Sequence, residues 1–299
     1  MNGLDRLILG SNPLVGVSHY SSRSAHDKLY QLTNEKVIAT IDAALTSGAT
    51  AINFSPTRRM YDVLKLMRDR GYNKQFNVYL MLPDMELFRE AMLTGGTAAV
   101  AKQMLAGVGW VNRITLVAGS ALSIMSRDPL RFLESYIDFE LRKLEGILPQ
   151  NAKIKSILVH EQLTDLAIAL GAVDTLKEFA RYAAKRCMMP GFITRNYPLA
   201  VQFSTEYGIN LAEVVIMTPF NRIGFQMTPD RETCEAILSS RPESKTVGMS
   251  ILAGGRVPLN EAVEYLKSIY TLKSIVVGVS SVTHAKETMS LFSTITDRQ

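Results

Sequence analysis

Short apolar runs alternate with longer amphipathic stretches along the whole chain, and this alternation limits the folds that the chain can adopt. The runs contain few polar residues, which is typical of parallel strands that are covered on both faces. The pattern therefore predicts an α/β fold built around a parallel sheet. Nine runs are candidate strands, at residues 7–10, 51–55, 77–82, 113–118, 155–160, 191–195, 214–218, 245–250 and 274–279.

The stretches between the runs have the spacing of apolar residues that is typical of helices. One helix is expected to begin at Asn34 and to end at Gly48, and another is expected over 61–70, before Gly71. Asn260 is expected to cap the helix that carries Val263, because asparagine is favoured at that position. Further helices are expected over 86–105, 129–148 and, as one long helix, 165–186.

Repeated strand–helix units lead either to a closed barrel or to an open doubly wound sheet. The first turn, from Gly10 to Pro13, lacks the glycine-rich pattern of an open nucleotide-binding sheet. No break in composition divides the 299 residues, and barrels of this class have about 250 residues. We therefore predict a single-domain TIM (β/α)8 barrel over residues 1–299. Such a barrel has eight strands, so one candidate is surplus, either 113–118 or the first short run.

Composition limits the class of protein and its partners. Apolar residues make up 47% of the chain and charged residues 20%, as in ordinary globular proteins. Cys187 and Cys234 lie far apart, which argues against a disulfide scaffold or a zinc ribbon. The chain shows neither a signal-peptide pattern nor an apolar run of about 18 residues, so we expect a cytoplasmic protein with no membrane partner.

The net charge of +5 is small and comes without a dense basic run that contains aromatic residues. Such a run is typical of nucleic-acid binding, so we expect no nucleic-acid partner. A mild positive charge is compatible with a small anionic molecule as the ligand. The sequence does not predict the oligomeric state.

Barrels of this class bind ligands at the carboxyl ends of their strands. His160 closes a strongly apolar run, so its imidazole is expected at the barrel mouth as an acid, a base or a polarising group. Polar residues also follow other predicted strands. The candidate substrate-binding residues are Asn12, His19, Glu161, Arg195, Asn196, Asn221 and Arg222.

Arginines follow three consecutive predicted strands, at Arg195, Arg222 and Arg256. Their planar guanidinium groups suit a carboxylate or a phosphate, so together they favour an anionic ligand. Barrels often bind phosphate after their last two strands, through backbone N–H groups and a helix N-terminus. The candidate phosphate- or cofactor-binding residues there are Ser250, Gly254, Gly255, Arg256, Ser280 and Ser281.

A metal site has weak support in the sequence. His19, His160 and Asp84 could meet in space, but no H-x-H or H-E-x-x-H spacing is present. We therefore predict no metal ligands.

Several segments together resemble the aldo-keto reductase family, over most of the chain. ILGSNPLVG resembles its opening strand, and ATIDAALTSGATAINFS is similar to the helix and strand before its F-D-T-A motif. LVHEQLTD resembles the strand that ends in the catalytic histidine, which implies this role for His160. FITRNYPLA, GMSILAGGRV and VVGVSSVTHAKETM are similar to the G-V-S-N segment, the S-P-L-A-x-G segment and the phosphate-holding end of the barrel.

The chain departs from this family at three catalytic positions. Asn53 stands in place of the aspartate, Leu82 in place of the lysine, and Arg58 where the tyrosine is expected, with Tyr61 shortly after it. The candidate catalytic residues are therefore His160, Asn53 and Tyr61. Proton donation to a carbonyl by a tuned tyrosine is not available in its usual form. The cofactor is unknown, and NADP is implied by the resemblance alone.

These observations predict a divergent aldo-keto reductase-like enzyme that acts on a small anionic substrate. The reaction class implied by the resemblance is oxidoreduction, with His160 as the acid/base or polarising group. Two alternatives stay open. One is a non-catalytic ligand-binding barrel, and the other is a metal-assisted lyase or hydrolase.

Overall fold

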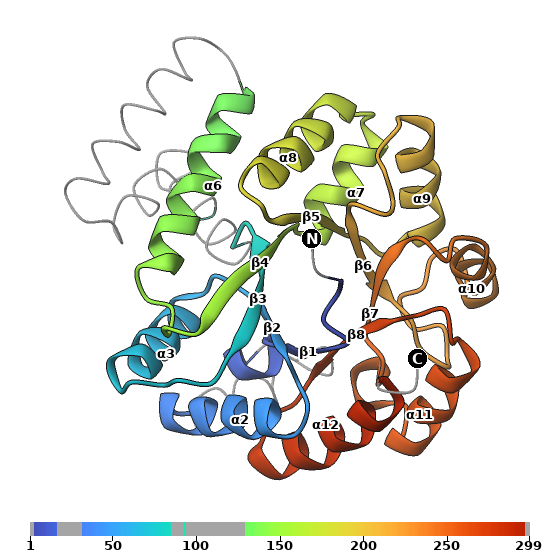
Figure 1. Cartoon of the computed structure of the whole chain (residues 1–299). Coiled ribbons are helices and arrows are strands. Elements are labelled where there is room, and N and C mark those ends of the chain that lie inside the picture. Colours follow the sequence, from blue (N-terminus) through green and yellow to red (C-terminus); the bar gives the residue numbers. More distant parts are fainter. Residues whose placement is uncertain (1–2, 17–31, 85–92, 94–128, 297–299) are drawn as a thin grey trace.

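Eight parallel strands close into a barrel in the computed structural model (Figure 1), which describes residues 3–16, 32–84, 93 and 129–296. Strand β1 pairs with both β2 and β8, and this pairing closes the ring. The predicted TIM barrel is therefore confirmed. The strands are β1 (Leu7–Gly10), β2 (Ala51–Phe54), β3 (Phe76–Leu82), β4 (Ala152–Val159), β5 (Met189–Ile193), β6 (Val215–Pro219), β7 (Lys245–Met249) and β8 (Ser274–Gly278).

The ring also identifies the surplus strand candidate. The first short run is β1, and β3 pairs directly with β4, so the barrel closes without residues 113–118. That run and, apart from Leu93, the helix expected over 86–105 lie outside the described residues.

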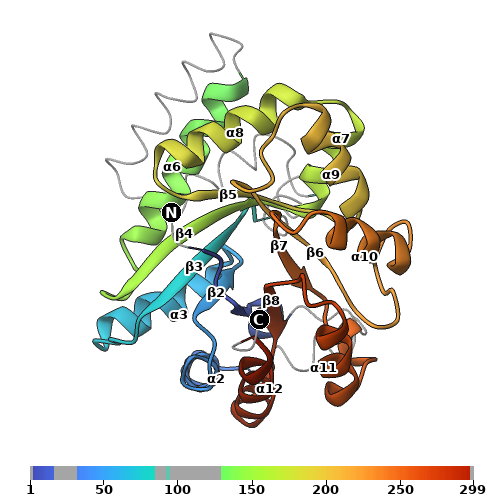
Figure 2. The same cartoon turned by 45° about the vertical axis from the view of Figure 1, so that its right-hand side comes forward.

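Helices surround the ring of strands (Figures 1 and 2) and cover the outer face of the sheet. None of the helices in the described part of the chain combines the length and the hydropathy of a membrane-spanning segment. The helical elements are η1 (Asn12–Val15), α2 (Asn34–Thr46), α3 (Arg58–Asp69), α6 (Pro129–Glu145), α7 (Glu161–Ala169), α8 (Val173–Lys185), α9 (Tyr197–Glu206), α10 (Arg231–Ser240), η2 (Ala253–Gly255), α11 (Leu259–Ser268) and α12 (Val282–Thr296).

Two helix predictions were wrong in detail. The long helix expected over 165–186 is two helices, α7 and α8, because Gly171 between them adopts a left-handed φ of +64° that ends the first. Helix α11 begins at Leu259, so Asn260 lies inside its first turn, and Pro258 is the residue that precedes the helix.

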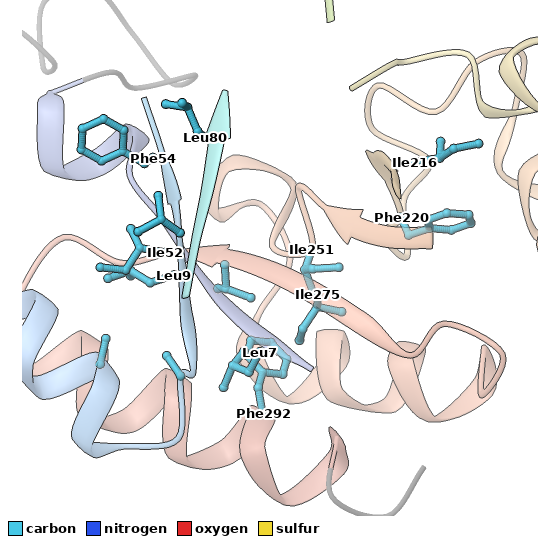
Figure 3. Packing of buried hydrophobic residues seen from close by; sticks show 14 of the residues in the cluster. Leu7, Leu9, Ile52, Phe54, Leu80, Ile216, Phe220, Ile251, Ile275 and Phe292 are labelled. Carbon is cyan, nitrogen blue, oxygen red and sulfur yellow. The ribbon is translucent and has the colours of Figure 1, made fainter. Parts of the chain in front are cut away.

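Side chains alternate between two cores along each strand, because successive residues of a strand point to opposite faces. In β1, Leu7 and Leu9 belong to the outer core between the sheet and the helices, whereas Ile8 points into the barrel. Figure 3 shows the outer core, where Leu7 lies beside Phe292 of α12. The interior is filled by buried residues that include Ile8, Tyr79, Leu158, Val215 and Val247. The interior of the barrel is therefore a packed core.

A buried polar network ties the strand starts together around Asp5, just before β1. One carboxylate oxygen of Asp5 accepts hydrogen bonds from Thr50 Oγ1 and Asn77 Nδ2, each at 2.9 Å. The other accepts from Tyr79 OH at 2.9 Å and forms an ion pair with Lys155 Nζ at 2.8 Å. The side chain of Asp5 is 6% exposed. One carboxylate thus links the starts of β1, β2, β3 and β4.

Replacing Asp5 by alanine is expected to lower the free energy of unfolding by about 3 kcal/mol, because it leaves a mostly buried lysine without its partner. Urea denaturation measures this loss. Asp69→Ala is the matched control, since Asp69 also pairs with basic residues but at an exposed site, where the loss is at most about 1 kcal/mol. Similar losses in the two variants would contradict a structural role for the Asp5 network.

Candidate functional site

A cleft of about 890 Å³ opens at the carboxyl ends of the strands. It lies where the barrel architecture predicts a ligand site. Many residues that the sequence singled out are brought together in its lining. These are Asn12, Asn53, His160, Glu161, Arg195, Ser250, Gly254, Gly255 and Ser280.

The floor of the cleft is mostly apolar. Met81, Met217 and Met249 line it from three strands, together with Ile193. Asn53 is 7% exposed and points its side-chain amide to the sulfur of Met217, with Nδ2 and Sδ 3.9 Å apart. Thioether side chains are flexible and polarizable, so this floor can adapt to apolar parts of different shape.

His160 follows the end of β4 and caps helix α7. Its backbone N–H donates to Leu82 O at 2.7 Å, and its Nδ1 accepts a hydrogen bond from the backbone N–H of Gln162 at 3.3 Å. A ring nitrogen that accepts carries no proton, so the proton of the neutral imidazole is on Nε2. The cap thus leaves Nε2–H as the donor of a side chain that lines the cleft, and this donor has no hydrogen bond to the described residues.

Burial lowers the pKa of His160 from its usual 6.5. Three nearby charges have smaller effects on this pKa: the carboxylates of Glu161 and Asp84 raise it, and the guanidinium of Arg195 lowers it. Desolvation disfavours the charged form, so His160 is neutral near pH 7 and serves as a hydrogen-bond donor.

Glu161 and Arg195 form an ion pair on the cleft lining, beside His160. Their side chains are 20% and 41% exposed. Asp165 holds the residues around Arg195 in place, because it accepts hydrogen bonds from Thr194 Oγ1 and from the backbone N–H of Arg195. Arg195 therefore reaches the cleft with its charge balanced by a carboxylate of the same chain.

Ser11 and Ser55, two polar residues at the ends of predicted strands, also line the cleft. Ser11 Oγ donates to Ser55 Oγ at 3.0 Å, and the backbone N–H of Ser55 donates to Ser11 Oγ at 3.1 Å. Asp84 and His284 also belong to the lining. Ser11 and Ser55 directly follow the ends of β1 and β2, and Asp84 lies two residues after the end of β3, so their position along the chain indicates a place at the cleft.

Three predicted polar residues form local hydrogen bonds and do not line the cleft. Asn196 caps α9 by accepting from the N–H of Leu199 at 3.1 Å. Asn221 is fully buried, and its amide exchanges two hydrogen bonds with the backbone of Phe225, at 2.7 and 2.8 Å. Ser281 accepts from the N–H of His284 at 3.2 Å, in the first turn of α12.

The three arginines do not converge on one ligand. Arg222 pairs with Glu261, with its Nε 3.4 Å from Oε2, and Arg256 lies over the ring of Phe225 at 4.6 Å. Neither lines the cleft, so of the three only Arg195 does. His19 lies outside the described residues.

Tyr61 is buried outside the lining of the cleft. Its hydroxyl donates to Glu140 of α6, and Lys143 Nζ lies 3.7 Å from its ring centroid and 3.9 Å from the Glu140 carboxylate. Burial raises the pKa of both Tyr61 and Glu140, and the Glu140 carboxylate raises that of Tyr61 further. These contacts join α3 to α6.

Metal ligands do not gather in the described residues, among which no three His, Cys, Asp or Glu side chains are placed to hold an ion together.

The loop after β7 has an unusual backbone. Ser250, Ala253, Gly254 and Gly255 all have positive φ, between 47° and 91°. This left-handed region is rare for residues other than glycine. The loop lines the cleft beside the end of β8, where Gly278 leaves no space for a side chain because a Cβ would lie 2.8 Å from Pro13. Backbone groups thus approach this end of the cleft closely.

No protein-family model matches the chain, and no curated protein is similar enough in sequence to match it. Solved structures are similar in shape. A putative aldo-keto reductase from Pseudomonas aeruginosa is 13% identical, with a TM-score of 0.57 and coverage of 96% of this chain and 90% of that one.

Two other solved structures are similar to this chain in fold. An aldo-keto reductase from Bacillus halodurans, in its holo form, and a glycerol dehydrogenase from Gluconobacter oxydans are each 12% identical. Their TM-scores are 0.54 and 0.52, and each comparison covers 96% of this chain and 86% of the other. The chain has the aldo-keto reductase fold. At such low identity the likeness establishes the architecture of this fold, whereas the reaction of this chain depends on the residues of its own cleft.

We expect His160 to be neutral at pH 7, with its proton on Nε2, because Nδ1 caps α7 and burial lowers the pKa. Nitrogen-15 NMR of the histidine rings distinguishes the two tautomers. A proton on Nδ1 would contradict the cap.

The lowered pKa also predicts how stability depends on pH. Since the unfolded chain binds this proton more readily, the contribution of His160 to stability is complete above about pH 6.5 and is lost as the pH falls toward the folded pKa. His160→Asn is the matched variant, because asparagine caps a helix without titrating. Between about pH 7.5 and 5, the wild type should lose more stability than this variant.

Proposed function

We propose that the chain is an oxidoreductase that acts on small carbonyl compounds carrying an anionic group, with His160 holding the carbonyl oxygen. The observation that carries this proposal is the state of His160. A neutral imidazole, fixed by a helix cap at Nδ1, has Nε2–H as its donor, and the side chain lines the cleft at the mouth of the barrel.

His160 is suited to stabilise charge that develops on a carbonyl oxygen. A donor that is already oriented and partly desolvated costs no reorganisation when that charge appears. The described lining of the cleft contains no tyrosine and no lysine. His160 is therefore the group that would hold or pass a proton at this oxygen, and the amide of Asn53 would orient the substrate beside it.

In this proposal, the apolar floor and Arg195 bind different parts of the substrate. Met81, Met217 and Met249 would contact the carbon skeleton. Arg195 would bind the anionic group, because its planar fork suits a carboxylate. Charge would thus fix the orientation of a substrate that the floor holds loosely.

The family resemblance implies a nicotinamide cofactor, and the residues at the β7 and β8 end of the cleft fit one. Ser250 and Ser280 offer hydroxyls, a Cβ at Gly255 would meet no neighbouring atom, and the first turn of α12 presents His284. Hydroxyls, backbone N–H groups and a helix N-terminus are suitable partners for a diphosphate. Such a cofactor would supply the hydride.

A ligand-binding barrel without turnover is the second candidate function. It is favoured by Asn53, which cannot carry the charge of the aspartate that the family resemblance leads us to expect at its position. The same cleft would then bind its ligand through His160 and Arg195 without reducing it.

Reduction of 4-carboxybenzaldehyde with NADPH, followed by absorbance, tests the proposal. His160→Gln is expected to lower kcat/KM by about 100-fold, the usual loss when a proton-handling group is removed. Tyr61→Phe should leave turnover nearly unchanged, because Tyr61 does not line the cleft. Loss of turnover in Tyr61→Phe with His160→Gln unaffected would reverse these two roles. NADPH binding without turnover in the wild type would favour the binding barrel.

A further inference from the structure

We propose that Glu161 is an internal competitor for Arg195, and that the cleft selects ligands whose carboxylate displaces Glu161 from the guanidinium. This inference rests on the proposed function for the location of the ligand, but it concerns the selection of ligands and not the reaction. It identifies the anionic group as a carboxylate and gives Glu161 a role in specificity.

The ion pair lies where a ligand can reach it. Glu161 and Arg195 both line the cleft next to His160, and Arg195 keeps 41% of its side chain exposed. Ion pairs with this exposure contribute little to stability, because water screens them and two long side chains must be held in place. Exchange of one carboxylate for another therefore costs the fold little.

Arg195 has donor capacity that Glu161 does not use. The recorded bond joins one terminal nitrogen, Nη2, to Oε1 of Glu161. The Nε of Arg195 is buried and has no hydrogen-bond partner in the described part of the structure. Because Nε is covered, a ligand would use the terminal nitrogens. A guanidinium can bind a carboxylate through two parallel N–H groups, so a ligand that binds both terminal nitrogens would make one more hydrogen bond than Glu161 does.

The surroundings of the pair allow the exchange to occur through side chains alone. The backbone of Arg195 is held by its hydrogen bond to Asp165, and Asn196 N–H donates to Thr194 Oγ1 at 3.0 Å. Glu161 is the first residue of α7. A helix N-terminus stabilises a carboxylate, so the displaced Glu161 keeps a favourable environment for its charge.

The exchange also changes the charge beside His160. Glu161 and Arg195 neutralise each other in the ion pair, and a bound carboxylate would leave this group with one net negative charge. The charged groups that act on His160 are Glu161, Arg195 and Asp84. A negative charge favours the imidazolium, so binding a carboxylate should raise the pKa of His160, whereas binding a neutral ligand should not.

Binding of benzoate and of neutral benzamide, measured by calorimetry and by NMR of the His160 ring, tests the inference on the full chain. Glu161→Gln keeps the size of the side chain but removes its charge. We expect it to tighten benzoate binding about fivefold, the strength of an exposed ion pair, and to leave benzamide binding unchanged. We expect Arg195→Gln to weaken benzoate binding about tenfold, because a charge-assisted hydrogen bond is lost.

Each outcome decides the inference. Tighter benzoate binding in Glu161→Gln, with a rise of the His160 pKa in the wild type on binding benzoate, supports it. Benzoate affinity that is unchanged or weaker in Glu161→Gln overturns it, as does equal binding of benzoate and benzamide in the wild type. Absence of turnover with NADPH would overturn the proposed oxidoreductase and leave a carboxylate-selective cleft, so the two failures are distinguishable.

Discussion

Closure of the eight strands is the constraint on which the other features of the chain depend. Because the strands are parallel, closure places every strand start at one end of the ring and every strand end at the other. At the first end, the carboxylate of Asp5 links the starts of four strands in a nearly buried network. At the second end, side chains from all parts of the chain meet around one cleft. Stability and ligand binding are thereby assigned to opposite ends of the molecule.

Most polar groups around the cleft have a structural partner as well as a place in the lining. His160 caps α7 while its other nitrogen stays free to donate, and Arg195 is balanced by Glu161. Ser11 and Ser55 hydrogen-bond to each other. A buried polar group that lacks a partner destabilises the fold, so these pairings stabilise the residues around the cleft. They also mean that a ligand must compete with contacts that already exist.

The sequence was sufficient to predict the barrel and the end that carries the cleft, because apolar strands have a simple signature and parallel strands end together. It was less reliable for helices. One long helix was predicted over 165–186, but Gly171 ends α7, and the apolar side chains of Leu166 and Leu170 are exposed, at 53% and 74%. Apolar periodicity predicts a helix without showing that its apolar face is covered.

Site residues were predicted only in part, since a position after a strand does not give the direction of a side chain. Arg195 lines the cleft, whereas Arg222 and Arg256 contact Glu261 and Phe225. Asparagine and serine after a strand also favour turns and helix caps, which is what Asn196 and Ser281 provide. The extent of the domain, the roles of the site residues and the cytoplasmic location stay predictions.

The methionine floor makes the cleft sensitive to its chemical surroundings. Peroxide converts a thioether into a sulfoxide, which is polar and chiral, and dedicated reductases reverse this change. Met81 and Met249 are partly exposed in the cleft, whereas Met217 is buried beside Asn53. Oxidative stress would therefore reach the first two before the third. It would make this binding surface more polar, so redox conditions would change which molecules the cleft accepts.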